Sequence, residues 1–349
     1  MAVKTLKIAC AGLGRMGKRH ALNYLNRTPR AQLVAVFTPD PKEIAWAQEN
    51  LEPAGVNTFT DYDEMLKFPG LEAVAIATVT AVHAEQAIKA INAELHVFSE
   101  KPLSTSVEVS QSVVDAAKAK PYLKVLCGFS RRFDKSYRDA YKRVNSIGGP
   151  AIFRSQTCDK LDPSGFFVQY AEFSGGIFVD CTIHDIDLAL WFLGDGCAVK
   201  SITASGITAV EPDLRKHRDV DNGIGIVEFW NDKIAYFYCS RMMAAGQHDM
   251  TEIIGPKGKL VVNGTPMVSL VEMHESNGVR RELPANYYER FEYAFVTMAN
   301  EFTAACLDNT PLPFELSGAV KALTISVALQ ESMNTGKKIL FSETGLRID

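Results

Sequence analysis

The stretch Leu6-Lys7-Ile8-Ala9-Cys10-Ala11-Gly12-Leu13-Gly14-Arg15-Met16-Gly17 decides how the first part of the chain folds. Its apolar run predicts a short buried strand over 6–11, and the residues that follow predict a helix to about Asn26. Between them stands G-x-G-x-x-G, whose glycines allow a tight turn, close approach of the backbone to a pyrophosphate, and packing of the helix on the strand. Exposed amides at the start of the helix favour an anion. We therefore expect a dinucleotide at the turn made by Gly12, Leu13, Gly14, Arg15, Met16 and Gly17.

A second predicted strand, 33–37, should end near the adenosine ribose of that nucleotide. An NAD site usually places an acidic residue there, about 20 residues after the glycines. Thr38 stands first at this strand end, Asp40 could reach the ribose hydroxyls, and Lys42 could instead meet a 2′-phosphate. We expect Thr38 and Asp40 to lie beside the nucleotide, with NAD favoured and NADP possible.

Further strands at 74–77, 96–98 and 124–127 alternate with helices such as 82–91. This alternation predicts parallel βαβ units in one open sheet. Ligands of such sheets lie beyond the carboxyl ends of the strands. That edge of the sheet should carry Thr78, Glu100, Lys101 and the segment Phe129-Ser130-Arg131.

Lys101 stands at one of these strand ends and is followed by Pro102. Proline restricts the residue before it to extended geometry, which would direct the lysine to one defined place. A lysine beside a cationic nicotinamide is easier to deprotonate and can hydrogen-bond a substrate hydroxyl. The structural alternative is a surface lysine in a strand-to-helix loop.

From about Phe133 the pattern changes to one dominated by strands. A helix over 134–147 ends at Gly148-Gly149-Pro150, and helices over 287–306 and 316–335 close the chain. The strands between them are predicted at 151–157, 199–207, 224–230, 234–240, 251–254 and 260–262. The predicted fold is α/β: an N-terminal Rossmann dinucleotide-binding domain over 1–129, and over 130–349 a substrate-binding and oligomerisation domain, an α/β domain with a large, mostly antiparallel open sheet.

A helix is also predicted over 180–193. Side chains four apart on a helix share a face, so Asp180 and His184 would project together, with Asp187 beside them. A carboxylate next to an imidazole is suited to acid/base chemistry. Alternatively, Asp180 caps the helix and His184 is an ordinary structural histidine.

The composition limits the classes of function. A chain of 349 residues is long enough for two domains, and 47% hydrophobic with 22% charged residues is ordinary for a globular protein. A net charge of −4 argues against nucleic acid or an anionic membrane as partner. Seven scattered cysteines without a C-x-x-C pair indicate reduced thiols in the cytoplasm and no metal site. The apolar run near the N-terminus is too short to cross a membrane.

Three motifs in order resemble the glucose–fructose oxidoreductase/inositol dehydrogenase/rhizopine catabolism (Gfo/Idh/MocA) family. They are the glycine turn, Glu100-Lys101-Pro102, and Gly175-Gly176 followed by Asp180, His184 and Asp185. The similarity spans nearly the whole chain. The segments 128–134, 180–187 and 219–221 look most like those of inositol 2-dehydrogenases.

The resemblance implies NAD(P)-linked hydride transfer at a hydroxyl of a sugar or cyclitol, by a homodimer or homotetramer. By position, Lys101, Asp180 and His184 match the catalytic group, and Arg131 and Asp187 match residues near the substrate. Besides the glycine turn, the nucleotide-facing positions are Thr78, His83, Glu100 and Lys101.

Two alternatives stay open at this point: an NADPH-dependent reductase of sugar carbonyls, and a non-catalytic dinucleotide-binding sensor of the same family. One departure puts inositol in doubt as the substrate. Inositol dehydrogenases generally carry a Gly-Tyr-Asp-Gln type segment after Ser-Arg, whereas here Ser240-Arg241 leads to Gly246-Gln247-His248-Asp249.

Overall fold

The structure is a computed structural model that describes residues 4–194 and 196–349, so the first three residues of the N-terminal stretch lie outside it. The chain forms two compact units. One contains the chain up to Phe133 together with Tyr293–Lys321, and the other contains Asp134–Glu292 together with Ala322–Asp349. Each unit is described by itself below.

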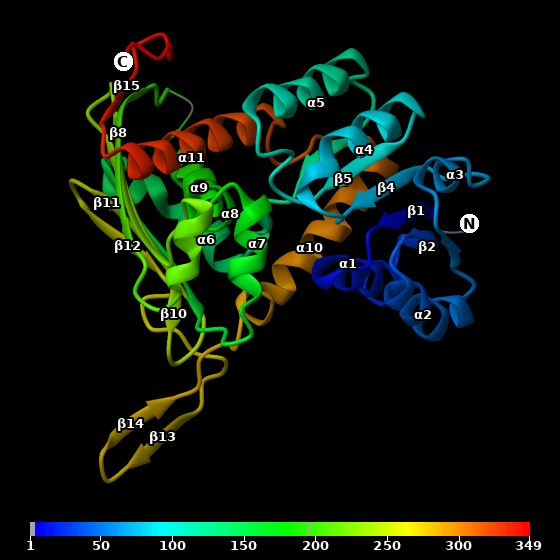
Figure 1. Ribbon diagram of the computed structural model, residues 1–349, viewed down its shortest axis with the longest axis horizontal. Coiled ribbons are helices and arrows are strands. Elements are labelled where there is room, and N and C mark those ends of the chain that lie inside the picture. The colour runs from blue at the N-terminus through cyan, green and yellow to red at the C-terminus, as the bar shows by residue number, and fades with distance from the viewer. Residues whose placement is uncertain (1–3, 195) are drawn as a thin grey trace. The chain divides into compact units, whose positions relative to one another are not determined.

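The first unit is built on a six-stranded parallel sheet in the order β3-β2-β1-β4-β5-β6, the strand order of a dinucleotide-binding Rossmann fold. Helices α4 and α5 lie on one face of this sheet and α1 and α2 on the other (Figure 1). Strand interiors such as Ile8, Val74 and Val97 are fully buried, as expected for a parallel sheet covered on both faces. The elements are β1 (Leu6–Ala11), α1 (Arg15–Asn26), β2 (Ala31–Phe37), α2 (Pro41–Asn50), β3 (Asn57–Phe59), α3 (Tyr62–Leu66), β4 (Ala73–Ile76), α4 (Thr80–Asn92), β5 (His96–Ser99), α5 (Val107–Ala119) and β6 (Val125–Cys127).

A late segment of the chain also belongs to the first unit, which a single boundary at residue 129 does not describe. Helix α10 (Tyr287–Asp308) carries Phe302, whose ring lies 6.3 Å from that of Phe98 in β5, and Phe295, whose ring lies 5.8 Å from that of His20 in α1. Both phenylalanines are buried. The helix returns because its apolar side chains are buried against the parallel-sheet unit, a contact between residues some 200 positions apart.

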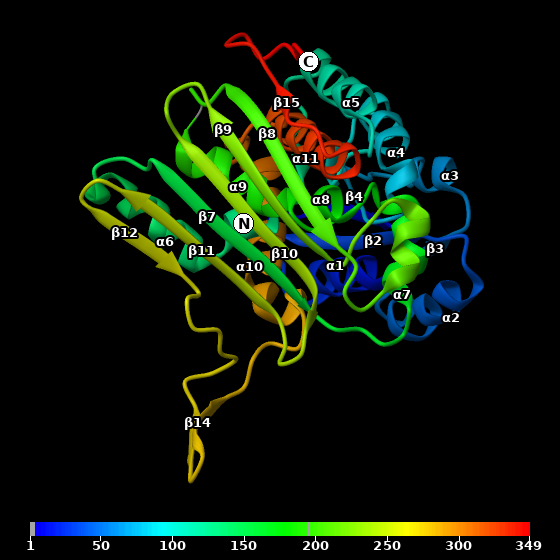
Figure 2. The ribbon, with the colours of Figure 1, turned by 60° about the vertical axis from the view of Figure 1, so that its left-hand side comes forward.

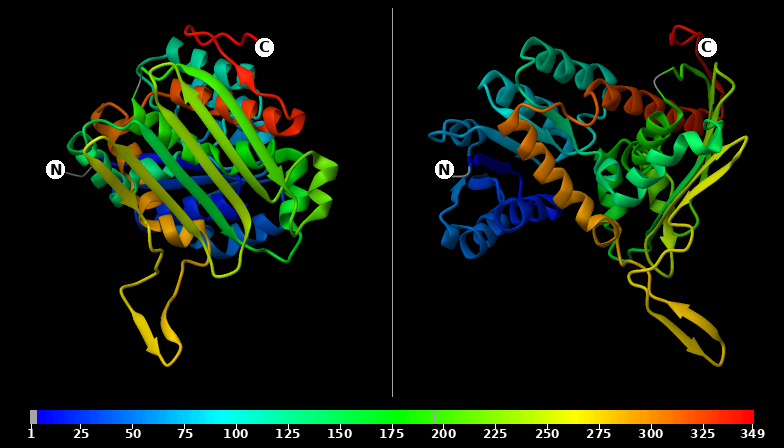
Figure 3. Two further views of the ribbon diagram at one scale, coloured as in Figure 1. Left: turned by 90° about the vertical axis from the view of Figure 1, so that its left-hand side faces the viewer. Right: turned by 180° about the vertical axis from the view of Figure 1, so that it is seen from behind.

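The second unit contains a seven-stranded mixed sheet in the order β12-β11-β7-β10-β9-β8-β15. Only the β7–β10 pair is parallel, which confirms the predicted mostly antiparallel sheet. The strands present one open face (Figure 3, left), and helices cover the other. The elements are α6 (Lys135–Arg143), β7 (Ile152–Lys160), α7 (Phe166–Ser174), α8 (Ile177–Asp180), α9 (Ile183–Leu193), β8 (Val199–Ile207), β9 (Asn222–Phe229), β10 (Ile234–Met243), β11 (His248–Gly255), β12 (Gly258–Val262), α11 (Ser317–Thr335, in this unit from Ala322) and β15 (Ile339–Leu340).

The open face of this sheet is apolar at its centre. Ile226 of β9 pairs with Tyr236 of β10, and both side chains are exposed while their strand neighbours are buried. Ile224 and Ile234 extend the same exposed patch. A two-stranded hairpin, β13 (Glu272–Glu275) with β14 (Gly278–Arg281), stands off from the sheet (Figure 2).

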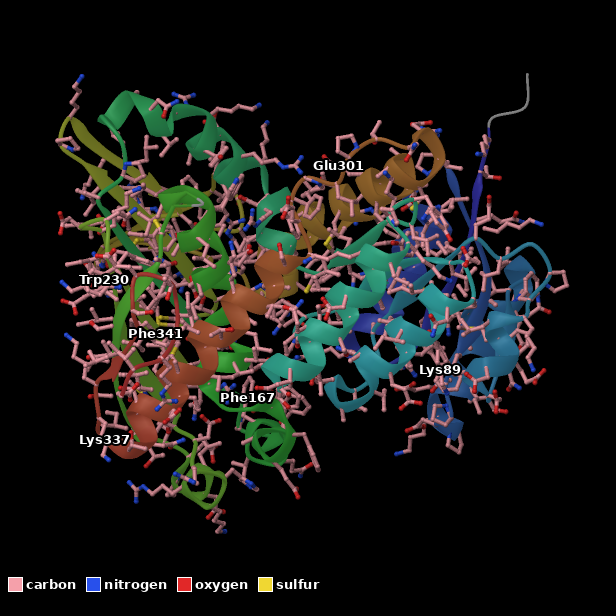
Figure 4. All side chains as sticks on the ribbon, turned by 90° about the horizontal axis from the view of Figure 1, so that it is seen from above. Lys89, Phe167, Trp230, Glu301, Lys337 and Phe341 are labelled. Carbon is pink, nitrogen blue, oxygen red and sulfur yellow. The ribbon has the colours of Figure 1, made fainter. Side chains whose placement is uncertain are left out.

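The chain directly after the C-terminal strand β15 is hydrogen-bonded to Trp230, the residue that follows β9. Its indole Nε1 donates to the carbonyl oxygen of Phe341 over 3.1 Å, and both residues are labelled in Figure 4. Among the described residues, no helix has the length and apolar character needed to cross a bilayer.

Candidate functional site

The glycine turn has the geometry of a nucleotide cradle. Gly12 has φ +84°, and a Cβ added to it would lie 2.7 Å from the carbonyl oxygen of Ala77. A Cβ on Gly17 would stand 2.0 Å from the carbonyl oxygen of Gly12, so only glycine lets α1 pack on the turn. A Cβ on Gly14 would meet nothing within 4 Å except Glu43 Oε1 at 3.6 Å. The second glycine thus borders open space, as it does where the backbone approaches a pyrophosphate.

Helix α1 begins directly at this turn, at Arg15. Its N-cap is Gly14, which offers no side-chain hydrogen bond to the amides of the first turn. Such amides bind anions at a helix start. The residues present therefore fit a dinucleotide, which would place its pyrophosphate against Gly14 and the first turn of α1.

The end of β2 differs from what the sequence analysis expected. Thr38 is fully buried and its hydroxyl donates to the carboxylate of Glu43, whose Oε2 also accepts from the Leu13 N–H at 3.0 Å. Asp40 is the N-cap of α2 and accepts from the Lys42 N–H at 2.7 Å. Glu43 was missed because it lies in the first turn of the following helix, beyond the strand end where an acid is usually sought.

The loops after β4 and β5 are tied together by His83. This imidazole is 2% exposed, with Nδ1 2.9 Å from the carbonyl oxygen of Pro102 and Nε2 3.0 Å from that of Thr78. The Thr78 hydroxyl donates to Gln86 Oε1 at 2.7 Å. Burial lowers the pKa of His83, and the two carbonyls oppose this only in part. His83 thus fixes the backbone around the cis Lys101–Pro102 peptide.

Glu100, next to Lys101, is a buried anion. Its Oε1 lies 2.7 Å from His20 Nε2. Burial alone would raise the pKa of the Glu100 carboxyl, but the hydrogen bond and charge of His20, together with Lys101, hold that pKa below its usual value. Arg131, in the short 3-10 helix Ser130–Phe133 after β6, is also buried. Charged groups are therefore concentrated at the carboxyl end of this sheet.

The helix predicted over 180–193 is confirmed from Ile183 to Leu193 by α9, whereas Asp180 belongs to a separate short helix, α8. Asp180 ends α8, and α9 begins at Ile183. The amide of Thr182 bonds to the carbonyl oxygen of Ile177 at 3.2 Å, five residues back, and the normal helical pattern resumes with Ile186 bonding to Thr182. Since Cys181 and Thr182 keep right-handed helical dihedrals, the backbone stays coiled between Asp180 and His184.

Asp180 has partners that the sequence analysis did not anticipate. Its Oδ2 accepts from Arg241 Nη2 at 3.0 Å, and its Oδ1 accepts from the hydroxyl of Tyr170 in α7 at 3.3 Å. Arg241, in β10, is buried, with Nη1 3.6 Å from Asp219 Oδ2. The ring of Phe167, labelled in Figure 4, lies 4.6 Å from the Arg241 guanidinium.

The Arg241 cluster, by which we mean Arg241 with Asp180 and Asp219, is electrostatically coupled. Burial alone would lower the pKa of Arg241, but the charges of Asp180 and Asp219 raise it above its usual value. Burial raises the pKa of Asp219, and Arg241 opposes that rise. Asp219 Oδ1 also accepts from the amide of Ile177 at 2.8 Å. The cluster therefore fixes the short helix α8 that carries Asp180.

Helix α9 is held on the sheet by a neighbouring aspartate. Asp185 is fully buried and accepts from Thr157 Oγ1 at 2.6 Å and from the Ser155 hydroxyl, both in β7. His184 is half-buried beside it, and Asp187 is buried one turn further along. The paired roles of Asp180 and His184, and those of Arg131 and Asp187, stay predictions.

The segment that departs from the inositol dehydrogenase pattern is buried and polar. Gln247 Nε2 donates to Asp159 Oδ1 at 2.8 Å and to Asp249 Oδ1 at 3.2 Å. His248 Nε2 lies 3.3 Å from the carbonyl oxygen of Asn263. This segment thus places the Gln247 amide between two carboxylates.

Fold and site together define a dinucleotide-binding oxidoreductase with a Rossmann unit and a mixed-sheet unit. A family model described as "Oxidoreductase family, NAD-binding Rossmann fold" matches residues 6–128, and the Gfo/Idh/MocA C-terminal domain matches residues 139–261. The chain belongs to the Gfo/Idh/MocA family. This confirms the resemblance found in the sequence motifs.

Several relatives are similar over almost their whole length. The chain is 31% identical to scyllo-inositol 2-dehydrogenase (NAD(+)) of Bacillus subtilis (strain 168), covering 96% of each chain. It is 28% identical to myo-inositol 2-dehydrogenase of Thermotoga maritima, covering 97% of this chain and 99% of the relative. The crystal structure of scyllo-inositol dehydrogenase from Lactobacillus casei with bound NAD(H) and scyllo-inositol has a TM-score of 0.91 and 33% identity, covering 97% of this chain and 99% of that one.

The lowered pKa of His83 predicts a pH dependence of stability. In the pH range in which unfolded His83, with a pKa near 6.5, binds a proton, the folded residue stays neutral. Its contribution to folding stability is therefore present above about pH 6.5 and is lost as pH falls through the folded pKa. We expect His83→Gln to be less stable at pH 7.5 and to take up fewer protons on unfolding at pH 5.5 than the wild type, because the folded pKa of His83 lies below its usual value. Urea unfolding at several pH values measures this. The exposed His274→Gln variant is the control for the substitution itself. A pH slope in His83→Gln equal to that of the wild type would contradict the assignment.

Proposed function

We propose that this protein is an NAD-dependent dehydrogenase that oxidises a ring hydroxyl of a cyclitol, with inositols as the first candidates. The observation that carries the proposal is the combination of the open glycine turn with Lys101 at the end of β5 and with Asp180 and His184 in α8 and α9. A purely structural Rossmann protein has no need of all three polar residues. The inositol dehydrogenases among the relatives, one printed as NAD(+)-dependent and one solved with NAD(H) and scyllo-inositol, support the same substrate class.

The proposed reaction divides the work between the two units. Bound NAD supplies the hydride acceptor. His184 takes the proton of the substrate hydroxyl, since imidazole titrates near neutral pH. Lys101 hydrogen-bonds the oxygen as it gains negative charge. In this proposal Lys101 and His184 therefore both act on the reacting hydroxyl.

Asp180 has a narrower role in this proposal than that of a proton carrier. Its carboxylate is engaged by a buried guanidinium and by the Tyr170 hydroxyl, which favours the charged form and fixes its direction. We therefore assign Asp180 to orienting the reacting groups and to stabilising the charge that forms on His184. Arg241 acts through Asp180 as a positioning residue.

The two alternatives make different demands on the chain. A reductase of sugar carbonyls would use NADPH, yet the end of β2 holds the carboxylate of Glu43 close to the glycine turn. A non-catalytic sensor would bind the dinucleotide without turnover. Assays with cyclitols, aldoses and their oxidation products, each with NAD and NADP, separate the three functions by absorbance of the reduced nicotinamide.

We also propose that the protein is a homo-oligomer of the cytoplasm. The patch of Ile224, Ile226, Ile234 and Tyr236 on the open sheet face is contiguous and exposed, as expected of a surface that a second copy covers. All seven cysteines carry free thiols, which suits a reducing compartment.

The assignment of His184 is tested by turnover. His184→Ala should lose about 10²–10⁴-fold in kcat on an accepted cyclitol, because the proton acceptor is removed, and should bind NAD with nearly unchanged Kd. Steady-state kinetics and a fluorescence titration measure the two quantities. His274→Ala, in the exposed hairpin strand β13, should leave both unchanged. Wild-type turnover by His184→Ala would contradict the assignment of His184 as proton acceptor. If the wild-type protein oxidised no cyclitol, the proposed function itself would be wrong.

The role of Arg241 is tested by a pair of substitutions. Arg241→Gln removes the charge beside Asp180 and should lower kcat about tenfold or more, whereas Arg241→Lys keeps the charge and should restore part of the loss. NAD affinity should stay the same in both, which a general unfolding would not allow. Equal kcat in the wild type and a folded Arg241→Gln protein would show that the ion pair serves the fold alone.

The oligomer is tested at the centre of the apolar patch. Ile226→Lys places a charge at a position that a second copy should bury, so the mass in light scattering should fall to that of a single chain. Val109→Lys, on the exposed face of α5, is the matched control and should keep the wild-type mass. A single-chain mass for the wild type would contradict the proposal.

A further inference from the structure

Glu43 stands where the glycine turn and the end of β2 meet. Its Oε2 accepts from the Leu13 N–H at 3.0 Å and from the hydroxyl of the buried Thr38. Its Oε1 lies 3.6 Å from the position that a Cβ on Gly14 would occupy. One carboxylate oxygen is thus anchored to the turn while the other borders the open side of Gly14.

The residue that the sequence analysis expected to bind the ribose is already engaged in the local fold. Asp40 Oδ1 accepts from the amides of Lys42 at 2.7 Å and Glu43 at 3.4 Å, as the N-cap of α2. The Asp40 amide in turn donates to the Thr38 hydroxyl oxygen at 3.2 Å. Asp40 therefore shapes the start of α2, and this start presents Glu43 to the glycine turn.

We propose that Glu43 is the residue that selects NAD over NADP. In Rossmann folds the ribose of the adenosine lies at the end of the second strand, beside the glycine turn, and an acid there binds the 2′-hydroxyl. Glu43 supplies that acid from α2 in place of Thr38. The inference rests on the proposed dinucleotide-dependent function and adds the residue that sets its cofactor choice.

The geometry favours both attraction of the ribose and rejection of the phosphate. Because two donors fix Oε2, little side-chain freedom is lost when Oε1 accepts a hydroxyl. A 2′-phosphate at the same place would bring two negative charges together. The nearby cation Lys18 lies over the ring of Trp46, 4.9 Å from its centroid, and Lys42 is exposed.

The test measures nucleotide affinity directly, by fluorescence titration of the full-length protein with NAD, NADP and 2′-deoxy-NAD. The wild type should bind NAD at least about tenfold more tightly than NADP. Glu43→Gln should weaken NAD binding about tenfold and strengthen NADP binding, because a hydrogen bond to a charged group is lost and the repulsion is removed. Glu49→Gln, an exposed glutamate later in α2, should change neither affinity.

The deoxy analogue separates a ribose contact from a loosened turn. In the wild type, loss of the 2′-hydroxyl should weaken binding about tenfold, whereas Glu43→Gln should bind NAD and 2′-deoxy-NAD nearly equally. Should Glu43→Gln fail to fold, Glu43→Asp keeps the charge and should still reject NADP.

Three results would overturn the inference. They are an equal loss of NAD and NADP affinity in Glu43→Gln, an undiminished preference for NAD in that variant, or a folded Glu43→Asp that accepts NADP as well as NAD. If the wild type oxidises a cyclitol with NAD while one of these results is found, only the assignment of Glu43 fails. If the wild type binds neither nucleotide, the proposed function fails with it.

Discussion

The close contact between the first turn of α1 and the turn after β1 is the constraint on which the nucleotide-binding unit depends. It exists because positions 12 and 17 lack side chains, so the helix lies against the carbonyl of Gly12 and Gly12 lies against the end of β4. This contact sets where α1 starts, next to the open side of Gly14. The other polar groups of the unit, Glu43 and Glu100 among them, are arranged along the carboxyl edge of the sheet.

Each unit carries a largely buried pair of a carboxylate and a basic side chain at, or next to, a residue assigned to chemistry. In the first unit His20 and Glu100 pair next to Lys101, and in the second Arg241 pairs with Asp180. Burying charge is costly unless the geometry is good and further hydrogen bonds are made. Both clusters meet that condition through neighbouring amides, hydroxyls or aromatic rings. These two buried polar clusters are better explained by the need to hold a reacting group in one orientation than by a contribution to stability alone.

In the proposed function, the polar groups of the second unit suit a substrate ring with many hydroxyls. Gln247 joins Asp159 and Asp249, and Tyr170 reaches Asp180 from α7. The replacement of the family's tyrosine segment by Gly246–Asp249 therefore exchanges one hydrogen-bonding group for another and preserves the polar character. In the proposed function, this change bears on which cyclitol fits.

The sequence by itself determined the parts of this protein that depend on neighbours in the chain. G-x-G-x-x-G between a strand and a helix requires the β1–α1 turn, the alternation of strands and helices requires the parallel sheet, and the family motifs point to Lys101, Asp180 and His184. Only the tertiary structure decided the return of α10 to the first unit, the ion pair between Asp180 and Arg241, which are 61 residues apart, and the place of Glu43 at the glycine turn. Helical spacing also did not predict the interruption between α8 and α9 at Cys181 and Thr182. Buried contacts, such as the hydrogen bond from the amide of Ile177 to Asp219, fix α8 independently of α9. Local spacing reports what a segment prefers, whereas these features come from partners that folding brings together from distant parts of the chain.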